Sequence, residues 1–248
     1  MPLVESEAII LRSTPFSEAD KLVSFLSRRF GRLRGVAPAA RKSRRRFGPA
    51  LEPLTHVRLW FFDRENRELV RLQECELIQP FWEGATQYES SVALSHIAEL
   101  CELLLPEREP SERTFRLTLM TLQTIRQGQP IWLALPYFQL WSLRLAGWLP
   151  DLDRCSRCNR RLTETDAGGV SSSLDQLFCS TCALAGTRTL SAESRRAAAQ
   201  ILAQPLTRLV AQDSHKGPLL ELQRYLLDLI EHHAEHKLAT REPLHETA

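Results

Sequence analysis

The feature that most constrains the fold of this chain is a pair of C-x2-C motifs in its second half. The first runs from Cys155 to Cys158 and the second from Cys179 to Cys182, with twenty residues between them. Each motif brings two sulfur atoms within reach of one ion, and the segment between them closes a loop that joins the two pairs. Four thiolates at about 2.3 Å form the closed tetrahedral shell of structural zinc. We therefore expect one structural zinc ion (Zn2+) in a small module over residues 151–187.

Composition bears on this interpretation through the redox compartment. No apolar run reaches the roughly 18 residues of a membrane helix, and the first ten residues lack the layout of a secretion signal. We therefore expect a cytosolic protein without a membrane partner, in which six cysteines argue for a metal and against disulfides. An iron–sulfur cluster also uses four cysteines, but the paired spacing favours zinc. Cys75 and Cys101 lie in a predicted strand and a predicted helix, where we expect them to be core residues.

The first 81 residues alternate between apolar and polar side chains and contain frequent turn residues. Five short strands are predicted, over residues 6–12, 20–27, 31–37, 55–62 and 69–78. In residues 55–62, the side chains of Val57, Leu59 and Phe61 share one face. One longer connection spans residues 38–53. This strand count matches a closed five-stranded barrel of the oligonucleotide-binding (OB) type, although a small open sandwich fits nearly as well.

Beyond residue 81 the hydrophobic period changes from two to about 3.6, which predicts a domain boundary. Apolar stripes predict helices over residues 92–104, 131–146, 191–204 and 218–238, and a further one after an N-cap at Ser111. We expect the last ten residues to be frayed. The predicted fold is α+β and has two domains, an OB-type barrel at 1–81 and a helical domain at 82–248 into which the zinc module is inserted.

A strongly basic stretch lies within the predicted barrel. Residues 28–46 hold nine Arg or Lys and no acidic residue, and residues 1–82 carry a net charge of +5 against −3 for the rest. Such a run repels itself unless an anion binds, and nucleic acid is the commonest anion of this kind. A solvated loop without a partner is the alternative. The predicted DNA-binding residues are Arg28, Arg32, Arg34, Arg41, Lys42, Arg44, Arg45 and Arg46.

Other candidate groups are weaker. Trp60 and Phe62 share the outward face of the fourth strand, where they can stack on bases, but packing against helices is the explanation that we favour. Four arginines flank the first C-x2-C motif, and they either contact phosphate or form a solvated rim. No phosphate-binding glycine loop and no nucleophile elbow is present, and His232 with His236 has no third ligand. We expect a protein that is not an enzyme.

Three segments resemble the bacterial recombination mediator RecO family. The first is EAIILRSTPFSEADKLVSFLSRRFGRLRGVA (residues 7–37), and the second is the basic loop with a short connecting helix, RKSRRRFGPALEPL (residues 41–54). The third is FQLWSLRLAGWLPDLDRCSRC (residues 138–158), a helix running into the first cysteine pair. Ser17 and Ala40 stand where the family pattern has glycines, so we expect those two turns to differ in detail.

The resemblance implies an N-terminal OB barrel and a helical domain that carries the zinc module. It also implies binding of single- and double-stranded DNA, annealing of complementary strands, pairing with RecR, and contact with the C-terminal tail of the single-stranded-DNA-binding protein. Together these activities help load RecA onto coated DNA, so we expect a DNA repair and recombination mediator associated with the nucleoid.

Two other function classes fit parts of the sequence. A zinc-stabilised transcriptional regulator that reads duplex DNA would need a basic helix-turn-helix, whereas the helices here are apolar-striped and only modestly charged. An RNA-binding accessory protein would use the same barrel, and the sequence does not distinguish RNA from DNA.

Overall fold

The computed structural model describes residues 3–42, 46–63, 67–82, 87–171, 173–212 and 215–247, the side chains as far as residue 244. The chain forms two compact units, residues 1–126 and 127–248. The first unit holds five strands and two helices, and the second holds five helices and a small sheet among the described residues. The domain boundary that we predict at residue 81 separates the strands of the first unit from its helices, and it stays a prediction.

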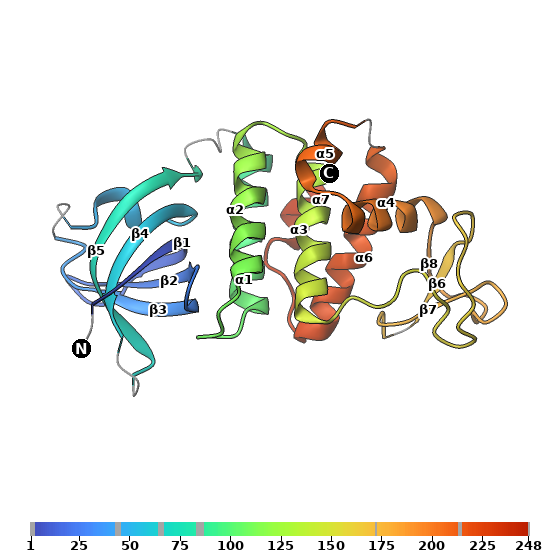
Figure 1. Ribbon diagram of the computed structural model, residues 1–248, viewed down its shortest axis with the longest axis horizontal. Coiled ribbons are helices and arrows are strands. Elements are labelled where there is room, and N and C mark those ends of the chain that lie inside the picture. Colours follow the sequence, from blue (N-terminus) through green and yellow to red (C-terminus); the bar gives the residue numbers. More distant parts are fainter. Residues whose placement is uncertain are drawn as a thin grey trace. The chain divides into compact units, whose positions relative to one another are not determined.

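The five strands of the first unit close into a barrel in the order β1-β2-β3-β5-β4 (Figure 1). They are β1 (Leu3–Pro15), β2 (Lys21–Ser27), β3 (Gly31–Ala37), β4 (Thr55–Phe62) and β5 (Leu69–Pro80). All neighbours pair antiparallel except β3 and β5, which pair in parallel. The longer connection contains the predicted short helix, η1 (Gly48–Leu51). All five predicted strands are therefore present, and they form the closed barrel and not the open sandwich.

The barrel encloses one hydrophobic core. Val57, Leu59 and Phe61 of β4 point inward, as their alternation predicts, and each is fully buried. Phe61 packs edge-on against Phe25 of β2, with ring centroids 5.8 Å apart. Cys75 also lies in this core, as expected.

Two helices complete the first unit, α1 (Tyr88–Leu104) and α2 (Glu112–Arg126), which contact each other. The predicted N-cap is confirmed, because Ser111 Oγ accepts the backbone N–H of Thr114 at 3.3 Å. Cys101 is buried on α1, as expected. The turn between β2 and β3 meets the α1–α2 connection at Gly31, where a Cβ atom would lie 2.1 Å from the carbonyl oxygen of Glu109. Only glycine allows this approach, and its φ of +71° also favours glycine.

The second unit is built around α3 (Ile131–Ala146), which packs against α6 (Lys216–Ala234). Pro136 lies inside α3 without ending it. The predicted fourth helix is α4 (Ala192–Ala203), capped by Ser191. Two helices were not predicted, α5 (Leu206–Val210) and α7 (Arg241–Thr247).

The expectation of a frayed C-terminus is wrong. Arg241 at the start of α7 forms ion pairs with Asp228 and Glu231 on α6. The prediction failed because it considered only the polar composition of the last ten residues, whereas the anchor lies on another helix. No helix in the described part of the chain has the length and apolar character that a membrane crossing requires.

Between α3 and α4 the chain forms the predicted inserted module. The short strands β6 (Gly168–Val170) and β7 (Leu177–Phe178) lie within it and β8 (Thr189–Leu190) follows it, in the sheet order β7-β6-β8. We call residues 151–187 the four-cysteine module, and β8 joins it to α4.

Candidate metal centre and nucleic-acid interface

The four cysteines of the two C-x2-C motifs meet in the four-cysteine module. Their sulfur atoms all lie within 4.8 Å of one another, and Cys158 Sγ is 3.8 Å from Cys179 Sγ. Zinc–sulfur bonds of about 2.3 Å place the corners of a tetrahedron about 3.8 Å apart. Cys155 and Cys179 are buried, Cys182 is half-buried and Cys158 is exposed. The donor set and its spacing therefore fit one four-coordinate zinc ion.

The surroundings of the cluster lower the pKa of two of its thiols, Cys155 and Cys179, and raise the pKa of a third, Cys182. The hydroxyl of Thr181 lies 3.1 Å from Cys179 Sγ and lowers the pKa of that thiol to about 6, with help from the neighbouring thiols. The pKa of Cys182 is raised to about 12, mainly by its hydrogen bond with Cys179. Adjacent thiolates repel unless a cation lies between them, so a metal ion is the natural partner of this cluster.

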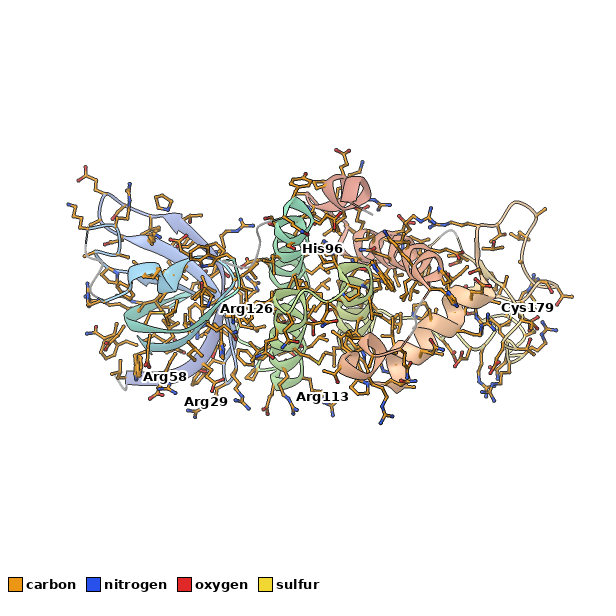
Figure 2. The ribbon with its side chains drawn as sticks, turned by 90° about the horizontal axis from the view of Figure 1, so that it is seen from above. Arg29, Arg58, His96, Arg113, Arg126 and Cys179 are labelled. Atoms are coloured by element: carbon orange, nitrogen blue, oxygen red, sulfur yellow. The ribbon has the colours of Figure 1, made fainter. Side chains whose placement is uncertain are left out.

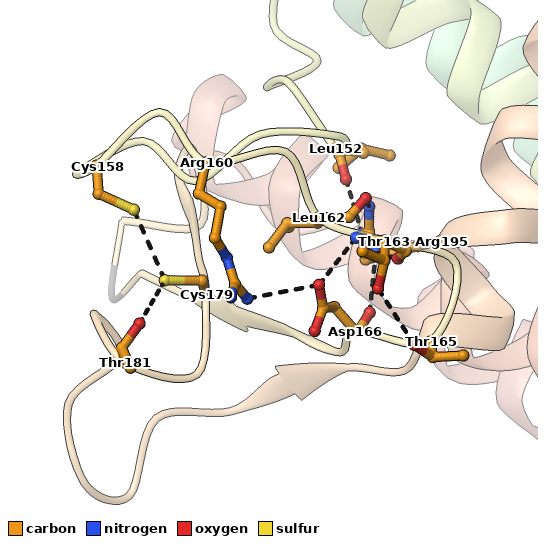
Figure 3. A network of polar contacts seen from close by, with 10 residues as sticks. All are labelled: Leu152, Cys158, Arg160, Leu162, Thr163, Thr165, Asp166, Cys179, Thr181 and Arg195. Carbon is orange, nitrogen blue, oxygen red and sulfur yellow. Dashed lines mark hydrogen bonds and ion pairs between the residues drawn. The ribbon is translucent and has the colours of Figure 1, made fainter.

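A single arginine fastens the four-cysteine module to α4 (Figure 3). The guanidinium of Arg195 donates to the carbonyls of Leu152 at 2.7 Å, Asp166 at 2.8 Å and Thr163 at 3.0 Å, and more weakly to that of Leu162. Only 4% of this residue is exposed. Burial lowers the pKa of Arg195, which nevertheless stays charged. The sequence contains no signal for this role, because Arg195 and Arg196 are adjacent on one helix and only the first is buried.

The arginines around the first cysteine pair are exposed. Arg160 pairs with Asp166 at 3.4 Å, and Arg154 donates weakly to the carbonyl of Asn159. These contacts lie within the module, so neither of the two roles considered for these arginines is decided by them.

Two of the predicted DNA-binding arginines on β3 are engaged within the first unit. Arg32 donates to the carbonyl of Leu105 at 2.8 Å and pairs with Glu107 at 3.3 Å. Arg34 pairs with the same carboxylate at 2.7 Å. Both arginines therefore hold the end of α1 to the barrel.

Arg28, in the turn before β3, is engaged in the same way. It pairs with Glu112 on α2 at 2.9 Å and with Glu7 on β1 at 3.4 Å. The hydrogen bond that Arg28 donates to the carboxylate of Glu112 is the main cause of a raised pKa for Arg28. Sequence reasoning missed this role because the partners lie up to 84 residues away along the chain.

The loop after β3 carries two exposed cations that have no carboxylate partner among the described residues. Arg41 and Lys42 are exposed, and neither forms an ion pair within the described residues. Arg44 and Arg45 lie outside the described residues. Arg46 is half-buried, because it stacks over the Phe47 ring at 5.3 Å and donates to the carbonyl of Pro38. Of the predicted set, Arg41 and Lys42 are the described cations most available to phosphate.

The strand register places one further cation in line with Arg34. Arg12 on β1 lies opposite Ser24 on β2, which lies opposite Arg34 on β3. Arg12 is exposed, whereas Ser24 is 6% exposed and its hydroxyl has no hydrogen-bond partner among the described residues. The outward face of β1, β2 and β3 therefore carries a polar, cationic row. Sequence reasoning missed Arg12 because it precedes the basic stretch, and only the register brings it alongside.

The opposite outward face of the barrel is electrically balanced. Trp60 is half-buried between Glu5 and Glu74 on the flanking strands. Arg58 points outward (Figure 2), where it pairs with Glu5 and with Glu76. Carboxylates beside Trp60 repel phosphate, so this face suits nucleic acid less well than the face of β1, β2 and β3.

A groove of about 1010 Å³ opens within the second unit. Its lining combines apolar side chains with cations and carboxylates. Representative lining residues are Leu133, Leu162, Ile201, Leu219, Arg161 and Arg196.

Comparison with known proteins accounts for both units. Residues 1–81 match the family model described as recombination protein O N terminal, and residues 85–242 match recombination protein O C terminal. A DNA repair protein RecO from Koribacter versatilis is 42% identical over 96% of each chain. One from Anaeromyxobacter sp. strain K is 30% identical over 99% of this chain and 97% of its own.

A third relative, the DNA repair protein RecO from Nocardioides sp., is 34% identical over 77% of this chain and 79% of its own. The N-terminal family model covers the strands of the barrel, and the C-terminal model covers α1 to α6 and the four-cysteine module. The chain belongs to the recombination protein O family of DNA repair proteins.

Proposed function

We propose that this protein is a recombination mediator that binds single- and double-stranded DNA through its barrel and anneals complementary strands. Together with RecR it would help RecA load onto DNA that is coated with the single-stranded-DNA-binding protein. The protein would act on chromosomal DNA in the cytosol. Binding and annealing need no covalent chemistry, so the protein acts without catalytic residues. Family membership supports the DNA repair role, and the remaining steps are proposals.

The observation that carries the proposal is the pair of exposed cations in the loop after β3. Arg41 and Lys42 are exposed without carboxylate partners among the described residues, and Arg12 lies on the neighbouring strand face. Contacts of this kind neutralise phosphates without reading the base sequence. Neutralising two strands at once lowers their mutual repulsion, and base pairing then completes the annealing.

The ion pairs of Arg28, Arg32 and Arg34 reduce the expected number of phosphate contacts. Eight predicted cations would release about seven counterions from duplex DNA, since each contact contributes about 0.9 to the salt slope. With these three arginines engaged by glutamates, and Arg46 packed on Phe47, we propose a slope nearer to four. The measured slope is thus a direct count of the cations that remain available.

The metal that fits the four-cysteine module would be held by Cys155, Cys158, Cys179 and Cys182. When bound, it supplies folding free energy to a segment with few apolar side chains. All four positions of the tetrahedron are taken by protein ligands, so the site has the closed form of a structural zinc centre.

The groove of the second unit is the candidate site for the C-terminal tail of the single-stranded-DNA-binding protein. A tail that is apolar and acidic needs apolar and cationic side chains, and the groove lining includes both, among them Leu219 and Arg196. We expect Arg196→Glu to weaken capture of a synthetic tail peptide, whereas Arg224→Glu on the exposed side of α6 should not. Equal capture by both variants would remove the groove from consideration.

The experiment that tests the function is annealing of two complementary strands coated with the cognate single-stranded-DNA-binding protein, with naked strands as the control. We expect the protein to accelerate both reactions. The Arg41→Ala/Lys42→Ala double variant should slow both, whereas Arg58→Ala on the balanced face should slow neither. If the protein accelerates annealing of naked strands but not of coated strands, the proposed DNA interface stands and the proposed recognition of the single-stranded-DNA-binding protein is rejected. If neither substrate anneals, the mediator proposal fails.

A further inference from the structure

The turn between β1 and β2 carries an aromatic side chain that the structure leaves in solvent. Phe16 is 54% exposed, although a phenylalanine gains about 1.5–3 kcal/mol from burial. Single exposed apolar residues are common and carry no meaning alone. Phe16 differs because of the rigidity of its turn and the identity of its neighbours.

The turn is closed by a short network of hydrogen bonds. The backbone N–H of Phe16 donates to the carbonyl of Asp20 at 3.0 Å. The hydroxyl of Ser17 accepts the N–H groups of Ala19 at 3.3 Å and Asp20 at 3.1 Å. Ser17, which replaces an expected glycine, thus fixes the turn through its side chain. The backbone that bears Phe16 is preorganised, so ordering it on binding costs little entropy.

The same turn is bonded to the basic loop. The guanidinium of Arg41 donates to the carbonyl of Ser17 at 2.7 Å, and its backbone N–H donates to the carbonyl of Ala19 at 2.9 Å. The carboxylate of Asp20 accepts the N–H of Ala39 at 2.9 Å. These three bonds hold an exposed aromatic residue and an exposed cation on adjacent backbone segments.

We propose that Phe16 is a stacking platform for an unpaired base of single-stranded DNA, while Arg41 and Lys42 bind the flanking phosphates. An aromatic face next to cations is the combination by which proteins hold single strands without reading their sequence. Bases within a duplex are stacked on their neighbours and do not offer a free face. Phe16 therefore adds a preference for single strands to an interface whose cations bind both forms. This inference rests on the proposed DNA binding and adds strand selectivity to it.

Glu18 is the one exposed carboxylate of this turn that accepts no hydrogen bond among those described. It repels phosphate, so the strand must leave Phe16 on the side of Arg41 and Lys42. Glu18→Gln should accordingly tighten binding of single and double strands alike.

The test is fluorescence anisotropy with a labelled oligothymidylate and with a duplex of equal length at one salt concentration. We expect Phe16→Ala to weaken single-strand binding about fivefold or more and to leave duplex binding unchanged. Phe16→Trp should restore the affinity, and its indole emission should be quenched by the single strand. Phe16→Leu, which is apolar without a π face, should behave like Phe16→Ala. The matched control is Tyr88→Ala, an exposed aromatic on α1, which should bind as the unmodified protein does.

The outcomes separate this inference from the proposed function. If Phe16→Ala binds both DNA forms normally while Arg41→Ala/Lys42→Ala loses both, the DNA interface stands and the stacking role is rejected. If Phe16→Ala loses the same affinity for single-stranded and for duplex DNA, the stacking role is also rejected, because a stacking contact should not affect duplex binding. If the double variant itself binds both forms normally, the proposed DNA interface fails. Circular dichroism should show every variant folded, since Phe16 contributes little to the core.

Discussion

The barrel of residues 3–80 and the four-cysteine module of residues 151–187 are stabilised by different means. The barrel core contains fifteen buried residues gathered from all five strands and η1. The module instead relies on four sulfur atoms at one end and on Arg195 at the other. Its longest strand has three residues. The barrel loses stability gradually as its apolar contacts are removed, whereas the module depends on two localised sets of bonds.

This difference teaches that the two regions should respond to different treatments. A core of interlocking apolar side chains is sensitive to changes of volume and indifferent to chelators. A metal-stabilised module is sensitive to chelators and acid, because protons compete with the ion for the thiolates. The predictions that follow test this separation, from the largest expected effect to the smallest.

Removal of the metal should have the largest effect, and it should stay within the module. Structural zinc contributes about 10–16 kcal/mol in zinc-finger peptides, far more than one side chain. We expect Cys155→Ser to lose the metal, and amide hydrogen exchange over residues 151–187 to become fast. Cys101→Ser, a buried cysteine outside the cluster, should keep its metal. If the amides of the module remain protected from hydrogen exchange after complete metal loss, the metal does not stabilise its structure.

Truncation of the barrel core should affect the first unit alone. Phe61→Ala removes a fully buried ring that packs against Phe25, and we expect a loss of about 3–5 kcal/mol in the free energy of unfolding. Urea denaturation followed by hydrogen exchange in the barrel measures it. Phe62→Ala, on the half-buried outer face, is the matched control with a smaller loss. A change in metal content in Phe61→Ala would contradict the separation of the two regions.

Substitution of Arg195, which anchors the module to α4, should destabilise the module without releasing its metal. Arg195→Met leaves four carbonyl groups without their donor, and we expect a loss of about 3 kcal/mol in the second unit. Arg196→Met, its exposed neighbour, should change stability by less than about 0.5 kcal/mol. Thermal unfolding with a metal assay distinguishes the two effects. Complete metal loss in Arg195→Met would show that the anchor and the cluster are one structural feature.

The smallest effect concerns pH and resides in the first unit. His96 on α1 (Figure 2) is fully buried, and burial lowers its pKa from 6.5 to about 3. Below pH 6.5 His96 binds a proton in the unfolded chain but stays neutral in the folded chain. Its contribution to the free energy of unfolding is therefore present above that pH and is lost as the pH falls toward 3. Between pH 7 and pH 5 we expect a loss of about 2 kcal/mol from this group. Denaturation at both pH values should show a smaller difference in His96→Leu.

The alternating pattern of the first 81 residues predicted the strands well. Val57, Leu59 and Phe61 share a face in the sequence and share the core in the structure, because a side-chain period of two leaves little choice once one face is apolar. The cysteine spacing likewise predicted the meeting of four sulfur atoms. In both cases the signal is local in the sequence.

The parts that were not predicted depend on partners far along the chain. The ion pairs of Arg28, Arg32 and Arg34 were not predicted because their glutamate partners lie far away in the sequence, most of them in or beside the connection between α1 and α2. Arg241 looked like part of a frayed tail because its carboxylates lie on α6. A local reading of charge cannot tell an arginine that binds an outside anion from one that binds its own protein.

The closure of the barrel has a consequence for its synthesis on the ribosome. β1, β2 and β3 can pair as soon as they emerge, because each adjoins the next in the sequence. The two seams that close the barrel, β1 with β4 and β3 with β5, join distant residues. Until residue 80 has left the exit tunnel, the nascent three-stranded sheet therefore exposes two unpaired edges. Slow translation over residues 38–80 would prolong that exposure, and it is there that a chaperone would protect this chain most.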